Sequence, residues 1–219
     1  MRKCFMILLL LPLLVMGQIK GYWRLDGNAN DVTGVNNGTA MNVTYAQGII
    51  NQCGQFSTSY VNCGTNSSLN FGTGSVTISA WVQTTNTTSY ICICSKRHTG
   101  GSGFNCYVGA NYAYADGGGT NGVFTGTAKA ISDGLWHNIV FVYDRPGGKL
   151  RIYVDGVANG YTNFGSTTLN DTSPLLIGKT GMNTNDYFIG NIDIVIVYST
   201  VLTPAQIKNQ YALYKGFYQ

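Results

Sequence analysis

Short segments of apolar side chains, each ended by turn-forming residues, constrain the fold of this chain more than any other feature. In residues 76–83 (VTISAWVQ) every second side chain is apolar, which is typical of a strand with one buried face. Residues 136–143 (WHNIVFVY) are apolar on both faces, which indicates a strand in the middle of a layered packing. Residues 150–154 follow the turn sequence DRPGG, and Asp155-Gly156 then favours a type I′ hairpin turn, which needs positive φ at both central residues.

Strand and turn signals of this kind recur along most of the chain, whereas long helical patterns do not. Gly is abundant, at 29 of 219 residues, and favours turns, while the 15 Tyr favour strands. A chain of this length fits one large β-domain. We therefore predict an all-β fold, a two-sheet antiparallel β-sandwich (jelly roll), with one short C-terminal helix.

The helix is predicted near the end of the chain from its capping residues. Thr203 and Gln206 fit a capping box, and Pro204 stands at the first helical position, where its missing amide proton costs little. Ile207 and Tyr211 then fall on one helix face, because they are four residues apart. We expect this helix to close one end of the sandwich.

The N-terminus predicts export from the cell. Two basic residues precede an apolar stretch over residues 5–16, and small residues follow at the expected cleavage site. The stretch is shorter than the roughly 20 apolar residues that span a membrane, and no later segment is apolar enough to do so. We predict a signal peptide over residues 1–17, a single domain over residues 18–219, and a secreted, extracellular location, with the periplasm or the cell surface as alternatives.

Five of the six cysteines follow the predicted signal peptide, and an oxidising compartment permits disulfides. Cys53 and Cys63 flank a Gly-containing segment, and Cys94 and Cys106 flank an expected hairpin turn, so we predict these two bridges. Cys92 is expected on the same face as Cys94 and is an alternative partner for Cys106. A second possibility is that all five are small, reduced core residues. Metal binding is not indicated, because no matching His/Cys cluster accompanies them.

Four segments, taken in order, carry a resemblance to a known family. They are residues 22–31 (YWRLDGNAND), 75–82 (SVTISAWV), 133–156 (from DGLWHNI to VDG) and 188–207 (from FIGNID to LTPAQI). Together they resemble the laminin G-like jelly-roll domains of the concanavalin A-like lectin/glucanase superfamily. The resemblance implies two antiparallel sheets, one of them concave, and a carbohydrate-binding or adhesive role on secreted proteins. Where the family usually has an acidic residue in its closing strand, this chain has Ile194.

The same resemblance makes calcium a candidate cofactor. The first loop gathers oxygen-bearing side chains within six residues, including Asp26 and Asp31, and calcium prefers roughly six to eight oxygen ligands. Domains of this superfamily often hold a calcium ion, and Asp193 resembles an acidic position that faces this loop. We therefore predict a calcium site from Asp26, Asp31 and Asp193. The alternative is that the loop residues only cap their own backbone, as Asp and Asn do in turns.

Tyrosines beside short polar groups predict a sugar-binding surface. Such a surface needs aromatic rings, on which the apolar face of a sugar stacks, and a few polar groups that fix its orientation. Tyr112 and Tyr114 alternate, so both rings point the same way in a strand, and a second cluster precedes the closing strand. The predicted ligand-binding residues are Asn111, Tyr112, Tyr114, Asp116, Asp186 and Tyr187. The alternative is that these tyrosines are ordinary half-buried strand residues.

Charge and acidic composition narrow the function. The formal net charge is +4, falling to about +2 without the signal peptide, which is too weak a bias to predict nucleic-acid binding. Glycosidases use a pair of carboxylates, and those of this superfamily typically use Glu, whereas all nine acidic residues here are Asp. We therefore predict no enzymatic activity.

The sequence thus predicts a secreted, non-catalytic binding module, with carbohydrate binding of the lectin-like kind as the first hypothesis. The second hypothesis is a structural or adhesive domain that binds an extracellular or cell-surface protein. A glycoside hydrolase ranks third.

Overall fold

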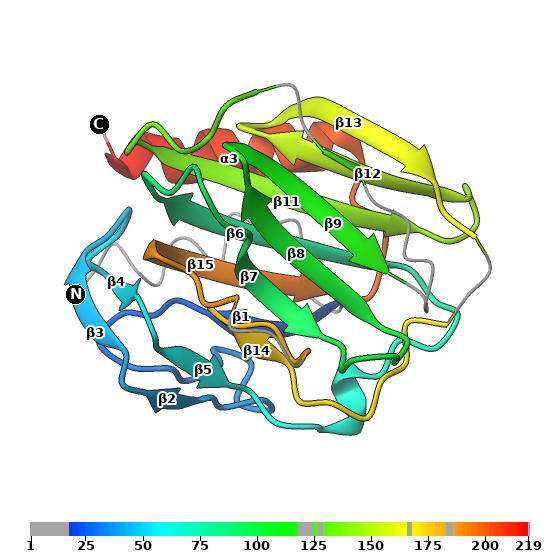
Figure 1. Cartoon of the computed structure of the whole chain (residues 1–219). Helices are drawn as coiled ribbons and strands as arrows, with labels where there is room; N and C mark the ends of the chain where they lie inside the picture. Colours follow the sequence, from blue (N-terminus) through cyan, green and yellow to red (C-terminus); the bar gives the residue numbers. More distant parts are fainter. Residues whose placement is uncertain (1–17, 118–124, 127–128, 166–167, 183–185, 219) are drawn as a thin grey trace.

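Two antiparallel β-sheets packed face to face make up the chain in the computed structural model (Figure 1). The structure describes residues 18–218 except 118–124, 127–128, 166–167 and 183–185, so the predicted signal peptide lies outside the described part. The predicted all-β sandwich with a C-terminal helix is confirmed.

Sheet A is formed by β1 (Ile19–Trp23), β3 (Thr44–Gln47), β4 (Gln52–Phe56), β6 (Val76–Gln83), β11 (Trp136–Asp144), β12 (Lys149–Val154), β13 (Val157–Asn163) and β15 (Gly190–Tyr198). Its order in the described residues is β13-β12-β11-β6-β15-β4-β3, with β1 also paired to β15. Sheet B is formed by β2 (Thr39–Met41), β5 (Tyr60–Asn62), β7 (Ile91–Lys96), β8 (Phe104–Gly109), β9 (Tyr112–Gly117), β10 (Thr125–Gly126) and β14 (Leu176–Ile177). Its order is β10-β9-β8-β7-β14-β5-β2. A short 3-10 helix, η1 (Ser67–Leu69), and helix α3 (Pro204–Tyr218) complete the described elements.

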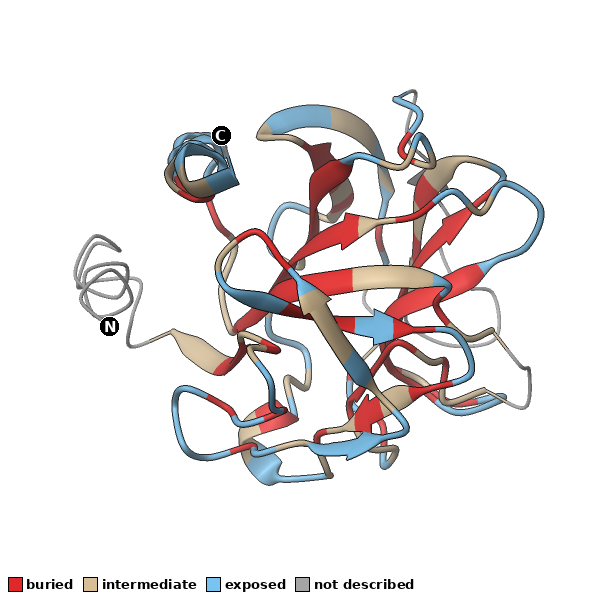
Figure 2. Cartoon of the chain, turned by 90° about the vertical axis from the view of Figure 1, so that its left-hand side faces the viewer, coloured by how far each residue is buried: buried red, intermediate tan, exposed pale blue. Residues whose placement is uncertain are grey.

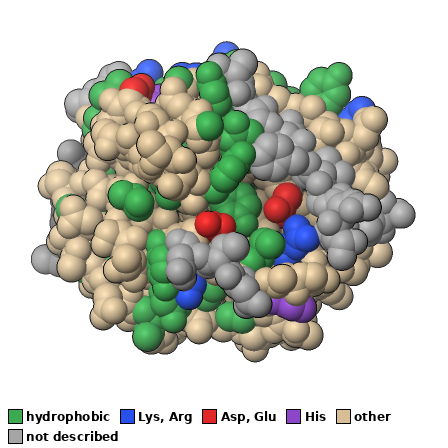
Figure 3. All heavy atoms as spheres, in the orientation of Figure 1, with side chains coloured by type: hydrophobic (Ala, Val, Ile, Leu, Met, Phe, Trp, Pro, Cys, Tyr) green, Lys and Arg blue, Asp and Glu red, His purple; other side chains and the backbone are tan. Residues whose placement is uncertain are grey.

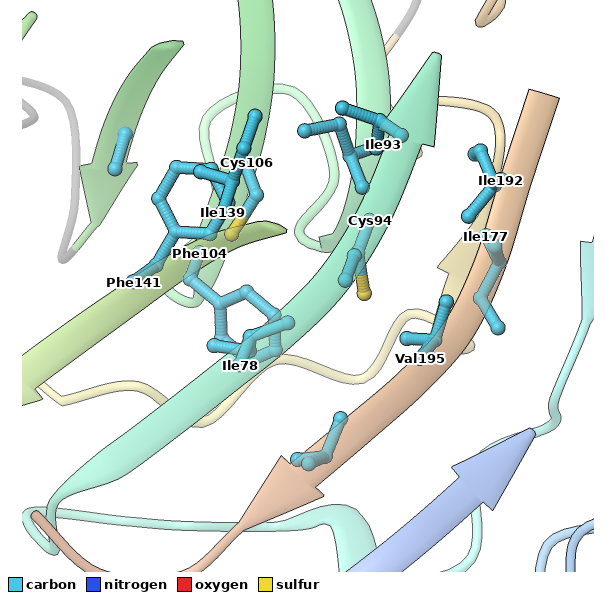
Figure 4. Packing of buried hydrophobic residues seen from close by; sticks show 14 of the residues in the cluster. Ile78, Ile93, Cys94, Phe104, Cys106, Ile139, Phe141, Ile177, Ile192 and Val195 are labelled. Atoms are coloured by element: carbon cyan, nitrogen blue, oxygen red, sulfur yellow. The ribbon is translucent and has the colours of Figure 1, made fainter. Parts of the chain in front are cut away.

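The inner faces of the two sheets form one apolar core. Every second residue of β6, from Val76 to Val82, belongs to this core, as its alternation predicted. Figure 4 shows side chains of both sheets meeting there, among them Val195 from sheet A and Ile93 from sheet B. Because side chains alternate along a strand, the remaining residues of sheet B are directed to its outer face.

Sheet A is apolar on its outer face as well, which explains the two-sided pattern of β11. Ile139 and Phe141 enter the core between the sheets. Val140 and Val142 belong instead to a second apolar cluster on the outer face, which contains residues of α3. The expectation that this strand lies in the middle of a layered packing is therefore confirmed.

Helix α3 covers the outer face of sheet A, on the side away from sheet B (Figures 1 and 2). Tyr211 stacks on Trp81 of β6, with ring centroids 5.6 Å apart and an interplanar angle of 18°. The predicted capping box is present, since the Gln206 amide donates to Thr203 Oγ1 (3.2 Å) and the Thr203 amide donates to Gln206 Oε1 (2.8 Å). The helix has 15 residues and covers a sheet face, whereas the sequence predicted a short helix at one end. Within the described part, no helix has the length and apolarity that a membrane crossing requires.

The five cysteines of the described part are buried and free, which corrects the predicted bridges Cys53–Cys63 and Cys94–Cys106. Cys53 belongs to the cluster under α3 and Cys63 to the core between the sheets, so the two thiols lie on opposite sides of sheet A. Cys94 and Cys106 are direct partners in the β7–β8 ladder. Direct partners have Cβ atoms about 4.5–5.5 Å apart, which is wider than a disulfide favours. The register also shifts between Cys92 and Cys94, so Cys92 does not share the core-facing side of Cys94 as expected.

His137 joins the start of β11 to the β12–β13 turn. Its Nδ1 lies 2.9 Å from Asp155 Oδ2, and its Nε2 lies 3.1 Å from Asp133 Oδ1. Asp155 and Gly156 have φ values of 52° and 77°, which confirms the predicted type I′ turn. Burial lowers the pKa of His137, but the hydrogen bonds and charges of the two carboxylates outweigh it and raise that pKa above 6.5. Folding therefore stabilises the imidazolium form of His137 relative to the unfolded chain.

The contacts of His137 with Asp133 and Asp155 predict that the free energy of unfolding depends on pH. Folding raises the pKa of His137 above 6.5. The charged form of His137 therefore contributes fully to the free energy of unfolding below pH 6.5, and this contribution is lost as the pH rises through the raised pKa. His137→Gln should lower the free energy of unfolding by about 2 kcal/mol at pH 6 and by much less at pH 9, measured by urea denaturation. His98→Gln is the control, because that ring is 53% exposed and has one carboxylate neighbour in Asp171. An equal loss at both pH values for His137→Gln would contradict the assignment.

Candidate functional site

The outer face of sheet B carries the predicted tyrosines on β9 opposite a matching row on β8. The ladder pairs Tyr107 with Tyr114 and Asn105 with Asp116. Val108 and Ala113 of the same ladder point into the core between the sheets. Alternation therefore places the first four side chains together on the outer face.

Three tyrosines form an aromatic group on this face, which we call the tyrosine cluster: Tyr90, Tyr107 and Tyr114. The Tyr90 ring meets the Tyr114 ring edge to face at 5.5 Å between centroids and the Tyr107 ring at 6.4 Å. Tyr107 is nearly buried, whereas Tyr90 is 48% exposed. Tyr112 lies close enough to Tyr114 to raise its pKa by charge interaction, although burial contributes more. The cluster thus presents ring surface to solvent on a rigid base.

A buried polar network lies beside the tyrosine cluster, and we call it the polar floor: Ser95, Arg97, Asn105, Asp116 and Thr180. Asn105 accepts a hydrogen bond from Ser95 Oγ (2.6 Å) and donates one to Asp116 Oδ1 (2.9 Å). Arg97 Nη1 donates to the same carboxylate oxygen at 3.0 Å. Burial raises the pKa of Asp116, against the lowering effect of Arg97 and Asn105. These contacts hold a carboxylate at the edge of the tyrosine cluster.

The described residues between β14 and β15 pack over one half of this face. The Gly181 amide donates to Ser95 Oγ (3.2 Å), and the Cys92 amide donates to the Asp186 carbonyl (3.3 Å). Tyr107 Oη lies 3.3 Å from Thr180 Oγ1. The segment leaves the β8–β9 half of the face less covered, because Tyr112, Tyr114 and Asp116 remain partly exposed.

The two predicted ligand clusters come together only in part. Burial raises the pKa of Tyr107, and the charges of Asp116 and Asp186 raise it further, so one residue of each predicted cluster acts on this ring. Tyr187 points elsewhere, because its ring pairs with Tyr60 at 6.5 Å. Lys179 Nζ lies over both of these rings, at 4.9 and 5.0 Å from their centroids.

Asn111 stabilises the β8–β9 turn and does not lie among the side chains of the outer face of sheet B. It stands in the β8–β9 turn with φ 75°, next to Ala110 with φ 46°. Its side-chain oxygen accepts a hydrogen bond from the Ser132 amide at 2.9 Å. Asn tolerates this left-handed backbone better than most residues, which accounts for its position.

Tyr90, Tyr107, Asn105 and Arg97 were missed by the sequence analysis. Their signal lies in the hairpin register, because the two-residue turn at Ala110-Asn111 pairs each residue of β8 with one of β9. Once that turn is recognised, Tyr107 must stand opposite Tyr114. Tyr90 precedes β7, and nothing in its own neighbourhood indicates the contact.

Figure 3 shows this face with its side chains coloured by type. Hydrophobic side chains run as a band across it, and two separate acidic groups lie near its middle. A basic group lies next to one of these acidic groups. The face therefore combines aromatic surface with few, fixed charges.

The predicted calcium ligands do not assemble as one group. Asp31 holds its own loop, since Oδ1 accepts from the Tyr22 amide (2.8 Å) and Oδ2 from the Asn36 amide (2.8 Å). Asp26 pairs with Arg24 and also accepts from Asn51 Nδ2. In the part of the chain that the structure describes, no three His, Cys, Asp or Glu side chains form a set that could hold a metal ion.

Asp193 differs from the other two because it is buried with an unsatisfied oxygen. Its Oδ2 accepts from the Ile49 amide at 2.8 Å, while its Oδ1 has no hydrogen-bond partner. Burial raises its pKa to about 8, and the charge of Asp26 acts in the same direction. The following residue, Ile194, has φ 52° at a bulge of β15, and its side chain packs in the apolar cluster under α3.

Comparison with known proteins places the chain in a family. The two packed antiparallel sheets define a β-sandwich of the jelly-roll kind. A family model described as the concanavalin A-like lectin/glucanases superfamily matches residues 55–208, which is more than half of the chain. The chain belongs to this superfamily, as its sequence motifs indicated.

Curated relatives match over a short region. A mouse protein, "Sushi, von Willebrand factor type A, EGF and pentraxin domain-containing protein 1", is 29% identical over 87 residues, and its rat counterpart is 27% identical over 88 residues. The match covers 36% of this chain and 2% of each relative. The chain thus corresponds to a small part of these proteins.

Solved structures share the fold at low sequence identity. Domain 4 of AbnA, an extracellular arabinanase from Geobacillus stearothermophilus, in complex with arabinotriose, has a TM-score of 0.70 and 18% identity, over 89% of this chain and 98% of that one. The binding domain of Paraclostridial Mosquitocidal Protein 1 has a TM-score of 0.75 and 16% identity, over 91% and 53%. The binding domain of Botulinum Neurotoxin DC in complex with SialylT has a TM-score of 0.69 and 14% identity, over 91% and 52%. The chain spans about half of the two toxin domains.

Removing the centre of the polar floor should destabilise the fold. Asn105→Ala removes the acceptor of the Ser95 hydroxyl and the Asn105 amide that donates to the Asp116 carboxylate, so the free energy of unfolding should fall by about 2–3 kcal/mol in urea denaturation. Asn163→Ala is the matched control, because Asn163 is exposed at the end of β13, and its effect should stay within about 0.5 kcal/mol. Equal stability of the two variants would show that the network is not a structural base for the face.

Proposed function

We propose that the protein is an exported, non-catalytic module that binds glycans on the outer face of sheet B. The observation that carries this proposal is the tyrosine cluster, in which the Tyr90 and Tyr114 rings stand partly exposed beside the hydrogen-bonded polar floor. Aromatic surface with a few fixed polar groups is the arrangement that small-molecule sites share. The rings supply stacking area for the apolar face of a sugar, and Asp116 supplies acceptors for its hydroxyls.

Structural neighbours support this choice of ligand class. The arabinanase domain was solved with arabinotriose bound, and the fold of this chain covers 98% of it. The Botulinum Neurotoxin DC domain was solved with SialylT bound. Both neighbours are under 25% identical to this chain, so they support the class of ligand and not its identity.

The chemistry of the face supports binding without turnover. Glycosidases place two carboxylates on either side of the scissile bond, with one held as an acid and the other as nucleophile or base. Here Asp116 already accepts hydrogen bonds from Arg97 and Asn105, and it anchors the polar floor. The chain has no Glu that could take either role.

Tyr114→Ala should weaken glycan binding about tenfold or more, because it removes ring surface from the middle of the cluster. The measurement is a glycan array, followed by calorimetry on the best ligand. Tyr161→Ala is the matched control, because Tyr161 is 69% exposed on β13 of sheet A, away from the proposed face. Equal losses of glycan affinity in Tyr114→Ala and Tyr161→Ala would contradict the location of the binding site on the outer face of sheet B. An intact fold that binds no glycan would contradict the function and favour the protein-interaction hypothesis.

We also propose that calcium binds at Asp193 and not at the three-residue set predicted from the sequence. The Oδ1 of Asp193, which has no hydrogen-bond partner, is an oxygen ligand of the kind that a hard cation prefers, and the charge of Asp26 acts on the same carboxyl group. A bound ion would supply the positive charge that this buried carboxylate lacks. Asp31 is not part of the proposed calcium site, because both of its carboxylate oxygens accept hydrogen bonds from backbone amides at the first loop.

Calcium should then raise the melting temperature of the wild-type protein. An increase of about 3–6 °C is expected in 5 mM CaCl2 relative to a chelator, if the affinity is in the range of extracellular modules. Asp193→Asn should abolish the increase, and 5 mM MgCl2 should not replace calcium. No shift in the wild-type protein would exclude the site.

A further inference from the structure

We propose that Tyr60, Lys179 and Tyr187 form a second subsite, which binds the carboxylate or sulfate group of an acidic glycan. We call these three residues the lysine subsite. The inference rests on the proposed function, since the lysine subsite lies on the same outer face of sheet B as the tyrosine cluster. Strand pairing brings its side chains together, and two aromatic rings hold its ammonium group.

The three side chains meet because of strand pairing and alternation. Val61 of β5 enters the core between the sheets, so the Tyr60 ring next to it is directed to the outer face. Lys179 stands opposite Tyr187 in an antiparallel bridge, two residues after the end of β14, and β14 pairs with β5 (Figure 1). Lys179 and Tyr187 are therefore cross-strand neighbours, and β5 brings Tyr60 beside them.

The backbone beneath the lysine subsite is tied to sheet B by hydrogen bonds. The Gly178 amide donates to the Ile93 carbonyl of β7 at 2.9 Å, and the Phe188 amide donates to the Gly178 carbonyl at 2.9 Å. Phe188 is fully buried. The neighbouring Lys179 and Tyr187 therefore face solvent from a fixed base, as the residues of a preformed site do.

Two rings orient the ammonium group of Lys179. Its Nζ lies 4.9 Å from the centroid of the Tyr187 ring and 5.0 Å from that of the Tyr60 ring. The two rings are 6.5 Å apart and tilted by 48°. A cation at this distance from a ring face is attracted by the ring quadrupole, and all three side chains stay partly exposed. An anion thus meets a lysine that has already lost much of its side-chain freedom.

The positive charge of Lys179 is not neutralised within the described part of the chain. Lys179 forms no ion pair there, and in particular none with Asp186, which precedes Tyr187 in sequence. The hydroxyl groups of Tyr60 and Tyr187 likewise have no hydrogen-bond partner among the described residues. One ammonium and two phenols are therefore available as donors on a single patch.

Other basic side chains on this side of the molecule differ from Lys179 in having acceptors. Arg97, His98 and Lys129 each lie against an Asp carboxylate. Lys96 is buried, and its Nζ donates to a backbone carbonyl at 2.7 Å. The charge of Lys179 is therefore available to a ligand, whereas the charges of these four residues already have partners in the fold.

An oxyanion supplies the acceptor that the lysine subsite lacks. Hydrogen bonds from an ammonium group to a carboxylate or sulfate are shorter and stronger than those between neutral groups. The hydroxyl of a neutral sugar accepts a hydrogen bond but leaves the positive charge unpaired. The lysine subsite therefore favours a sialic acid, a uronic acid or a sulfated sugar over an uncharged one.

The position of the lysine subsite favours a glycan over an acidic peptide. Lys179 is followed by Thr180, whose Oγ1 lies 3.3 Å from Tyr107 Oη in the tyrosine cluster. Consecutive Cα atoms are about 3.8 Å apart, so Lys179 begins one residue's length from the residue that contacts the cluster. A glycan whose neutral sugars stack on the tyrosine cluster can thus extend to place an acidic sugar at Lys179.

Matched pairs of glycans test the inference directly. The purified protein is titrated against lactose and 3′-sialyllactose, and against N-acetyllactosamine and its 6-sulfate, after an array has shown which core binds. The acidic member of a pair should bind about fivefold or more tightly than the uncharged one. Equal or weaker binding of the acidic member would overturn this inference and leave the proposed function standing. Silence on every glycan would overturn both.

Charge variants locate the preference. Lys179→Gln should reduce the ratio of the two affinities to about one, whereas Lys179→Arg, which keeps a cation over the rings, should retain most of it. Lys149→Gln is the matched control, because Lys149 Nζ also lies over a tyrosine ring, that of Tyr161 at 5.1 Å, but on sheet A. It should leave the ratio unchanged. Equal narrowing by Lys179→Gln and Lys149→Gln would overturn the assignment to the lysine subsite.

Salt and an acidic peptide complete the test. Raising NaCl from 20 to 500 mM should narrow the wild-type ratio, since a partly exposed charge pair is screened, and an unchanged ratio would overturn the electrostatic basis. A peptide that carries sulfotyrosine is compared with its unsulfated form. If this peptide bound through Lys179 more tightly than every acidic glycan, the ligand would be a protein, and the assignment to glycans would be overturned.

Discussion

Burial of the inner faces of the two sheets is the constraint on which the other features depend. Once Val108 and Ala113 enter the core, their neighbours in β8 and β9 are directed outward in opposed pairs. The tyrosine cluster and the polar floor are thus products of core packing and ladder register. A slip of one residue would turn Asp116 into the core and Ala115 out to solvent, at the cost of a buried carboxylate without its partners.

The parts of the fold that sequence analysis predicted are those with a local physical signal. Alternation in β6, two-sided burial in β11 and the capping box of α3 each depend on a few adjacent residues. The strand β2 could not be found in this way, because all three of its residues are exposed and carry no alternating pattern. The length and docking of α3 also escaped prediction, since they depend on the apolar outer face of a sheet that is distant in sequence.

The candidate site was predicted to a similar extent and for similar reasons. Tyr112 and Tyr114 share a face because they alternate within one strand, and this was visible in the sequence. The different surroundings of Asp186 and Tyr187 could not be predicted from the sequence, because adjacent residues point to different sides of the chain and the contact of Tyr187 with Tyr60 depends on tertiary packing. Tyr90 reaches the cluster from the segment before β7, a contact that depends only on tertiary packing.

The free cysteines have a consequence for the stability of the fold. Burial raises the pKa of Cys53 to about 11 and that of Cys94 to about 12, so both stay protonated and unreactive. Among the residues that the structure describes, the stability of the fold therefore depends on packing and hydrogen bonds and on no disulfide. A change in the redox state of the surroundings removes no contact that this part of the fold uses.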